Sequence, residues 1–153
     1  MLSCRQVLSL VAVVLGAAVA VSASASSPAG RYAVTDGTVR DTRTGRTWQR
    51  HIDPAHGVTW AGAAVYCQSL DVEGRGWRLP TVKELLSIVD VRVVDPAIDA
   101  TAFPEAVAAS WSATRWSMNP QYAYVVLFSG FESHSDLFFA TDQNQIVQVR
   151  CVR

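Results

Sequence analysis

One nine-residue segment, Trp77–Leu85, limits the fold of this chain more than any other stretch. Thr81 is followed three residues later by Glu84, which is the spacing of a capping box. In that motif the two side chains accept hydrogen bonds from backbone N–H groups that the first turn of a helix leaves unpaired. Pro80 ends the preceding segment. The residues after the cap place apolar side chains at helical spacing and predict a helix from residue 82 to about residue 89: Val82, Leu85, Leu86 and Val89.

A second helix is predicted to begin after Thr59, whose hydroxyl can cap its first turn. Gly74 and Gly76 are candidates to end it. One face of this helix carries apolar residues at helical spacing: Trp60, Ala63, Ala64, Cys67 and Leu70. Cys67 is therefore expected to point toward the core.

The remaining periodicity is typical of strands. Thr38–Asp41 and Arg46–Gln49 flank a Thr-Arg-Thr-Gly turn and predict a hairpin. Tyr122–Phe128 is a nearly continuous apolar run, as in a central strand covered on both faces. Asp136–Ala140 is expected to return beside it, and Ile146–Arg153 to form the last strand with Cys151 facing inward. Two helices before antiparallel strands, with a long irregular segment between them, predict an α+β domain.

The N-terminus has the pattern of a secretory signal peptide. Arg5 precedes an apolar segment from Val7 to Val21, and Ala23-Ser24-Ala25 offers small residues for cleavage. We therefore expect a signal peptide over residues 1–25, a flexible leader over 26–36 and one domain over 37–153. Cys4 lies before the apolar segment, which argues against a lipid anchor. The predicted location is periplasmic or extracellular, with no stable membrane insertion after cleavage.

The predicted mature chain has a small net charge. The full sequence contains 13 basic and 13 acidic residues, and cleavage removes Arg5, so the mature charge is 12 − 13 = −1. This balance gives no electrostatic reason to expect a nucleic-acid partner.

Two cysteines remain after cleavage, Cys67 and Cys151. Export to an oxidising compartment makes a disulfide between them the default expectation. The alternative is two free, buried thiols.

Four segments of the chain resemble the Lcl C-terminal domain family, found at the C-terminus of collagen-like bacterial adhesins and long described as a domain of unknown function: residues 41–49, 59–67, 76–85 and 149–153. The order and spacing of these segments, with Trp111-Ser-Ala-Thr114 before the last strands, carry the resemblance. It implies a C-type lectin-like fold, in which two helices flank antiparallel sheets and a long loop region presents the ligand surface. It also implies a disulfide from the first helix to the last strand, where Cys67 and Cys151 lie.

The resemblance suggests a binding function, since the best-known members of the family are surface adhesins that bind sulfated glycans through a trimeric head. This chain has no Gly-X-Y stalk, and it lacks the Glu-Pro-Asn and Trp-Asn-Asp motifs of calcium-dependent lectins. Asn119, Asp136 and Asp142 offer oxygen ligands, but calcium needs six or more, so solvated loop residues are the simpler interpretation. No metal or cofactor is expected.

The candidate ligand-binding residues are Trp111, Arg115 and Trp116. Two indoles and a guanidinium suit stacking on sugar rings and holding a carboxylate or sulfate. The alternative is that Trp111 begins a core strand and Trp116 covers the edge of the core. We assign Trp48, Trp60 and Trp77 to the core. A scattered basic set is expected to be solvated rather than gathered into an anion site: Arg75, Arg78, Lys83, Arg92, Arg115, Arg150 and Arg153.

An enzymatic function is not expected. The sequence has no nucleophile motif, and a disulfide would leave no free thiol in the mature chain. Glu132, His134 and Asp136 alternate and could offer metal ligands in a strand, although a solvated turn explains them equally well. The expected function is a non-enzymatic binding module for a glycan or a cell-surface protein. The alternatives are a structural component of an envelope assembly and a metal-dependent secreted enzyme.

Overall fold

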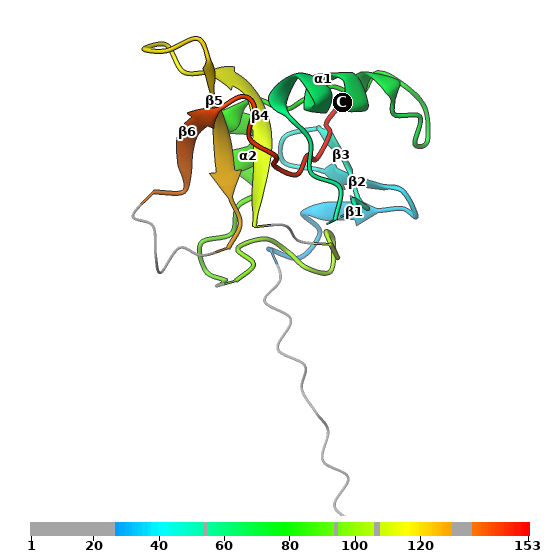
Figure 1. Ribbon diagram of the computed structural model, residues 1–153. Helices are drawn as coiled ribbons and strands as arrows, with labels where there is room; N and C mark the ends of the chain where they lie inside the picture. The colour runs from blue at the N-terminus through cyan, green and yellow to red at the C-terminus, as the bar shows by residue number, and fades with distance from the viewer. Residues whose placement is uncertain (1–26, 54, 94, 106–107, 130–135) are drawn as a thin grey trace, which may run out of the picture.

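The computed structural model describes residues 27–53, 55–93, 95–105, 108–129 and 136–153 (Figure 1). Within these ranges the chain forms two helices and two three-stranded antiparallel sheets, which confirms the predicted α+β class. The elements in chain order are β1 Tyr32–Val34, β2 Thr38–Asp41, β3 Thr47–Gln49, α1 Trp60–Ser69, α2 Val82–Ile88, β4 Ala109–Arg115, β5 Tyr122–Leu127 and β6 Phe138–Asp142.

The first sheet has the order β1-β2-β3 and contains the predicted hairpin. Gly45 takes φ +72° in the turn between β2 and β3, and its N–H donates to Asp41 O at 2.8 Å. The remaining strand of this sheet, β1, lies inside residues 26–36, where the sequence predicts a flexible leader. Its Tyr32 pairs with Asp41 of β2, so this part of the predicted leader is a strand. Its Tyr-Ala-Val sequence is apolar but only three residues long, which is too short to show the two-residue alternation of a strand.

Both helices begin at the predicted caps. The Thr59 hydroxyl accepts from Gly62 N at 3.3 Å, and Thr81 and Glu84 form both halves of the capping box. Helix α1 ends at Ser69 rather than near Gly74, because Leu70 is already extended while its N–H donates to Cys67 O. Gly74 and Gly76 instead take positive φ values in the following loop.

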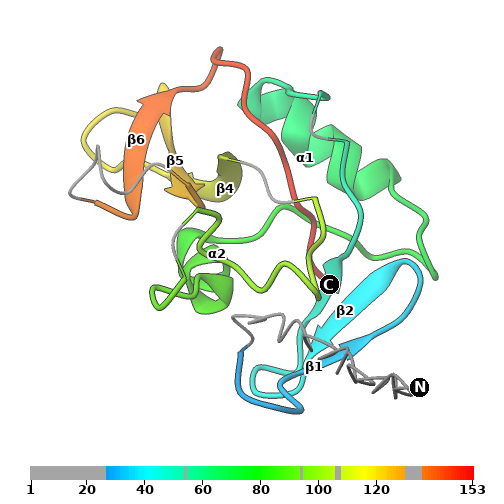
Figure 2. The same ribbon diagram turned by 90° about the horizontal axis from the view of Figure 1, so that it is seen from below.

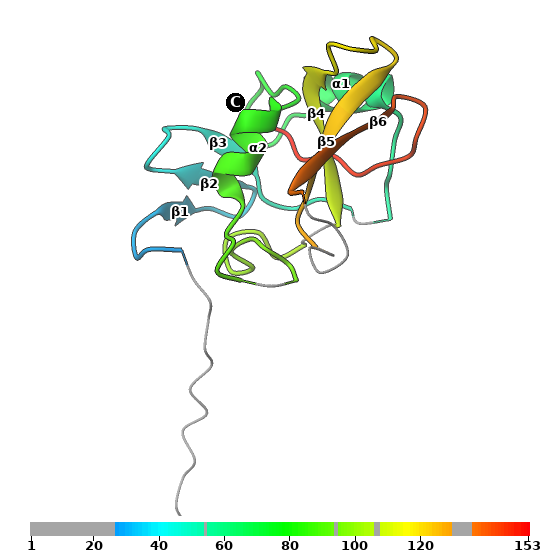
Figure 3. The ribbon, with the colours of Figure 1, turned by 90° about the vertical axis from the view of Figure 1, so that its left-hand side faces the viewer.

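The second sheet has the order β4-β5-β6, with β5 in the centre as predicted and β6 beginning two residues later than expected. Ala123 and Val125 pack with α1 residues and Trp111 in one core cluster, whereas Val126 packs with Leu85 and Ile88 of α2 in another. The two helices therefore cover different faces of this sheet, as Figure 3 shows.

The C-terminal segment is not the regular strand predicted for Ile146–Arg153. It changes partner along its length, through isolated bridges that join Val147 to Val58, Gln148 to Ser110, and Val152 to both Trp48 and Arg78. Figure 2 shows this segment passing between the two sheets. It cannot extend a single ladder because it connects both sheets. Val149 and Cys151 face the core near α1, as expected.

Candidate functional site

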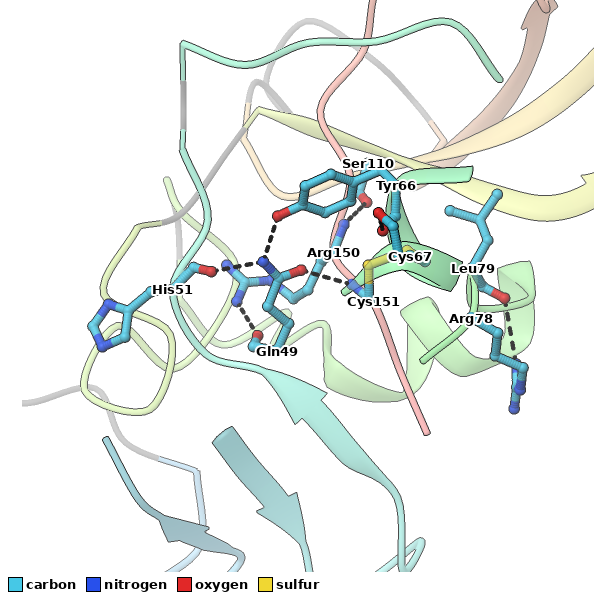
Figure 4. Close-up of a disulfide and its surroundings, with 10 residues drawn as sticks. Gln49, His51, Tyr66, Cys67, Arg78, Leu79, Ser110, Arg150 and Cys151 are labelled. Atoms are coloured by element: carbon cyan, nitrogen blue, oxygen red, sulfur yellow. Dashed lines mark hydrogen bonds between the residues drawn. A yellow bond between two sulfur atoms is a disulfide. The ribbon is translucent and has the colours of Figure 1, made fainter. Parts of the chain in front are cut away.

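The predicted disulfide is present between Cys67 of α1 and Cys151 of the C-terminal segment (Figure 4). The two Cα atoms are 5.5 Å apart, and both residues are fully buried. The bridge fixes the first helix to the segment that joins the two sheets.

Arg150, beside this disulfide, is fully buried, which corrects its assignment to the solvated basic set. Its guanidinium donates to Gln49 O and Arg50 O, each at 2.7 Å, and to Glu105 O at 2.8 Å. The guanidinium carbon lies 4.9 Å from the centre of the Phe103 ring. Burial lowers the pKa of Arg150 to about 10, so the group remains charged at neutral pH. Strand alternation correctly predicts that the side chains of Arg150 and Cys151 point to opposite faces of this segment. Arg150 is nevertheless buried, because both faces of the segment are covered.

The Gln49 side chain connects the hairpin to α1 and to the C-terminal segment (Figure 4). Its amide nitrogen donates to His51 O and to the Tyr66 hydroxyl, both at 2.8 Å. Its amide oxygen accepts from Cys151 N at 3.2 Å. These three bonds fix the orientation of the amide, and they make the Tyr66 oxygen an acceptor.

Trp111 lies in the core, as the alternative interpretation stated. It is fully buried, and its indole N–H donates to Val58 O at 2.8 Å. This burial removes Trp111 from any surface that a ligand can reach. The neighbouring Arg115 is exposed and stacks on Trp60, with 4.7 Å between the guanidinium carbon and the ring centre. Trp60 is half-buried rather than part of the core.

Trp116 lies at the other face of the sheet from Arg115. Its N–H donates to Tyr122 O at 2.9 Å, so the β4–β5 pairing continues to this residue, and successive side chains in paired strands point to opposite faces. Its ring packs edge-on against Tyr122 at 5.8 Å. Trp111, Arg115 and Trp116 therefore do not form one joint site.

The polar residues considered as metal ligands give no cluster in the described ranges. Asp136 is exposed, and Glu132 and His134 lie outside the described residues. Asn119 and Asp142 each accept a hydrogen bond from the backbone N–H two residues later, as turn residues do. No group of three or more His, Cys, Asp or Glu side chains that could hold a metal occurs among the residues described.

The predicted basic set does not gather into one patch either. Its members take separate partners along the chain: Arg75 with Asp71, Arg78 with Glu84, Arg92 with Asp90, and Arg153 over the Trp77 ring.

A second set of arginines, which shares only Arg92 with the predicted basic set, lines a cavity of about 390 Å³. Arg31 and Arg43 both donate to the same acceptor, Ser87 O at the end of α2, with a distance of 3.1 Å for Arg43. The two guanidinium groups therefore lie side by side, and Arg92 also lines the cavity. The rest of the lining comes from residues 28–30 and Thr42.

This cavity carries more positive than negative charge. Arg31 pairs with Asp41 at 3.4 Å, and Arg92 donates twice to Asp90, which holds the pKa of Asp90 below its usual value. No described carboxylate pairs with the Arg43 guanidinium. Three arginines against two carboxylates leave 3 − 2 = +1 at the cavity.

The sequence patterns did not predict this cluster. Arg31 lies in the segment assigned to a leader, Arg43 in the hairpin turn and Arg92 after α2. The turn position of Arg43 indicated exposure, but the approach of Arg43 to Arg31 depends on the pairing of β1 with β2 and on the position of α2.

These features define a small α+β domain with one disulfide and an arginine-lined cavity. The chain belongs to the Lcl C-terminal domain family, whose model matches residues 37–153. This match confirms the resemblance noted in the sequence. Searches of curated proteins and of solved structures gave no match. In the described part of the chain, no helix is long and apolar enough to cross a bilayer.

Proposed function

We propose that this protein is an exported, non-enzymatic binding module with a C-type lectin-like fold, and that it binds an anionic glycan. The observation that carries the proposal is the convergence of Arg31, Arg43 and Arg92 on one cavity. The buried disulfide supports export, because such bonds persist in oxidising compartments. Its connection of the first helix to the C-terminal segment supports the C-type lectin-like fold.

The arrangement of Arg31 and Arg43 favours an anionic ligand. Two guanidinium groups on one carbonyl oxygen repel each other, and a bound oxyanion would offset that repulsion. Arginine binds carboxylate and sulfate groups with paired N–H donors, which adds geometric selectivity to the charge attraction. The Arg43 guanidinium has the most freedom to turn toward a ligand, since its described acceptor is one backbone carbonyl.

The size of the cavity suits a sugar unit. Its volume of about 390 Å³ lies within the range of about 300–1,000 Å³ typical of small-molecule sites. Its walls combine the arginines with Pro28, Ala29 and Thr42, so an acidic sugar ring would meet both apolar and polar residues.

A glycan array that includes sulfated, carboxylated and neutral polysaccharides tests the proposal, with the disulfide-bonded protein at low and high salt. We expect saturable binding to acidic glycans that weakens at high salt. Arg43→Gln should bind about tenfold more weakly, because a charged hydrogen bond is lost. Arg75→Gln is the matched control, since this exposed arginine does not line the cavity.

The residues predicted from the sequence provide a second arm of the same experiment. If Arg115→Ala or Trp116→Ala abolishes binding while Arg43→Gln does not, the ligand surface lies on the face of the β4–β6 sheet that carries the sensitive residue. Absence of binding to every glycan would contradict the proposal and favour a protein partner in an envelope assembly. Stoichiometric metal in the purified protein would favour the enzymatic alternative at Glu132, His134 and Asp136.

A further inference from the structure

A second cavity, of about 240 Å³, lies beside the Gln49 network. Its lining combines two apolar side chains with three polar ones: Ile52, Val149, Asp53, His56 and Tyr66. It shares no lining residue with the arginine cavity.

The Tyr66 hydroxyl has a proton to donate. Gln49 donates its amide N–H to the Tyr66 oxygen, and the orientation of that amide is fixed by His51 O and Cys151 N. The hydroxyl therefore accepts from Gln49 and must direct its own proton elsewhere. Among the described residues, no acceptor takes that proton. Since Tyr66 lines the cavity, the cavity is where a ligand oxygen can accept it.

Asp53 supplies an acceptor on the same cavity. Its Oδ1 accepts from Ala55 N at 2.9 Å, which fixes the carboxylate in a turn and leaves Oδ2 for a ligand. The His56 ring lies 6.1 Å from the Tyr66 ring at an angle of 38°. The cavity thus offers a donor, an acceptor and two aromatic rings within one small space.

The apolar residues and the charges limit the class of ligand. Ile52 and Val149 are buried and present an apolar wall. The Asp53 carboxylate disfavours an anion, whereas the buried guanidinium of Arg150, next in the chain to Val149, disfavours a cation. A neutral ligand that has hydroxyl groups, which both donate and accept, and one apolar face fits these conditions.

We propose that this cavity binds a neutral hydroxylated ring, such as one monosaccharide unit. The Tyr66 hydroxyl donates to the ring, the Asp53 carboxylate accepts from it, and Ile52 and Val149 contact its apolar face. The volume of about 240 Å³ is below the range of about 300–1,000 Å³ for drug-sized ligands, so it favours a single ring. This site does not depend on the anionic ligand proposed above.

NMR titration of the isotope-labelled, disulfide-bonded protein tests the inference. The probes are methyl glycosides of glucose, galactose, mannose and N-acetylglucosamine, with inositol and glycerol as free polyols. We expect at least one methyl glycoside to give saturable shifts confined to the signals of residues 52–56, Tyr66 and Val149. Saturable shifts from inositol as well would extend the site to other neutral hydroxylated rings, whereas equally strong binding of acyclic glycerol would contradict a site for a ring.

Three variants connect such shifts to the proposed contacts. Tyr66→Phe and Asp53→Asn should each weaken binding by about two- to tenfold, the effect of one neutral or charge-assisted hydrogen bond. His56→Ala removes a side chain for which no hydrogen bond is described, so it should fold normally and bind more weakly. Tyr124→Phe is the matched control, because Tyr124 lies on β5 outside the cavity and should bind as the wild type does.

Two further results would overturn the inference. One is the absence of shifts at the cavity with every glycoside and polyol. The other is wild-type affinity in His56→Ala together with either Tyr66→Phe or Asp53→Asn. Arg43→Gln separates the two proposals, since it should weaken binding of acidic glycans and leave this titration unchanged.

Discussion

Arg78 and Glu84 form an ion pair with two hydrogen bonds, one of 2.7 Å and one of 2.9 Å. The same carboxylate accepts from Thr81 N at 2.8 Å as part of the capping box and from Arg46 Nε at 2.8 Å. Arg78 is bridged to Val152 through its backbone, and Arg46 lies in the turn before β3. One buried carboxylate therefore caps α2 and connects it to the hairpin and to the C-terminal segment.

Replacement of Glu84 should destabilise the fold. Glu84→Gln removes the charge that two arginines share and weakens the cap, which we expect to lower the free energy of unfolding by about 2–3 kcal/mol. Urea denaturation measures the change. Asp71→Asn is the matched control, because its pair with Arg75 is exposed, and we expect a change below about 0.5 kcal/mol. Equal effects of the two substitutions would contradict the assignment of Glu84 as a connecting residue.

Stability should fall in acid, and Glu84 should account for much of the loss. The hydrogen bond from Arg78 holds the pKa of Glu84 far below its usual range. A group whose pKa is lower in the folded state contributes stability above its unfolded pKa of about 4.3, and this contribution is lost as the pH falls toward the folded value. Unfolding curves between pH 7 and pH 2 should show this decline, with a shallower slope for Glu84→Gln. An unchanged slope in the variant would assign the acid sensitivity to other carboxylates.

The elements that the sequence predicted well are those with local signals. The caps at Thr59 and Thr81, and the turn at Gly45, depend on hydrogen bonds and φ values within a few residues. A short stretch of sequence is therefore enough to predict them. Strand β1 was not predicted because it has only three residues, although its partners on β2 are close in the sequence. The C-terminal segment was not predicted correctly because its bridges reach residues as far away in the sequence as Trp48.

The same distinction applies to the candidate sites. Trp111 and Trp116 are five residues apart, yet Trp111 enters the core beside α1 while Trp116 packs on Tyr122. Proximity in the sequence suggested a joint surface, but the fold places the two indoles in different environments. The approach of Arg31 to Arg43, in contrast, depends on β1, which the periodicity of the sequence did not reveal.

Loss of the disulfide should destabilise the protein strongly. Cys67 and Cys151 are 84 positions apart, and closing a loop of this length removes about 4–5 kcal/mol of chain entropy from the unfolded state in the simple loop model. We expect the Cys67→Ala, Cys151→Ala double variant to unfold at a clearly lower temperature than the oxidised protein. Calorimetry with and without dithiothreitol provides the check, since reductant should lower the Tm of the wild type and leave that of the double variant unchanged.

Replacement of Arg150 by either lysine or methionine should destabilise the protein. Its planar guanidinium donates to the carbonyls of Gln49, Arg50 and Glu105 and stacks on Phe103, whereas a lysine ammonium has no planar fork to match these positions. Methionine fills similar space but leaves the three carbonyl oxygens without this donor. We expect each substitution to lower the free energy of unfolding by about 2–4 kcal/mol, measured by urea denaturation.

The comparison of the two Arg150 variants separates charge from hydrogen bonding. A buried charge is costly to desolvate, so Arg150→Met would stabilise the protein if that cost exceeded the value of the three hydrogen bonds. Arg75→Lys, at an exposed position, controls for the general effect of replacing arginine by lysine and should change stability little. Stabilisation by Arg150→Met would mean that this guanidinium is retained for a reason other than stability. Destabilisation by both variants would mean that the hydrogen bonds of Arg150 hold the hairpin, the segment at Glu105 and the C-terminal segment together.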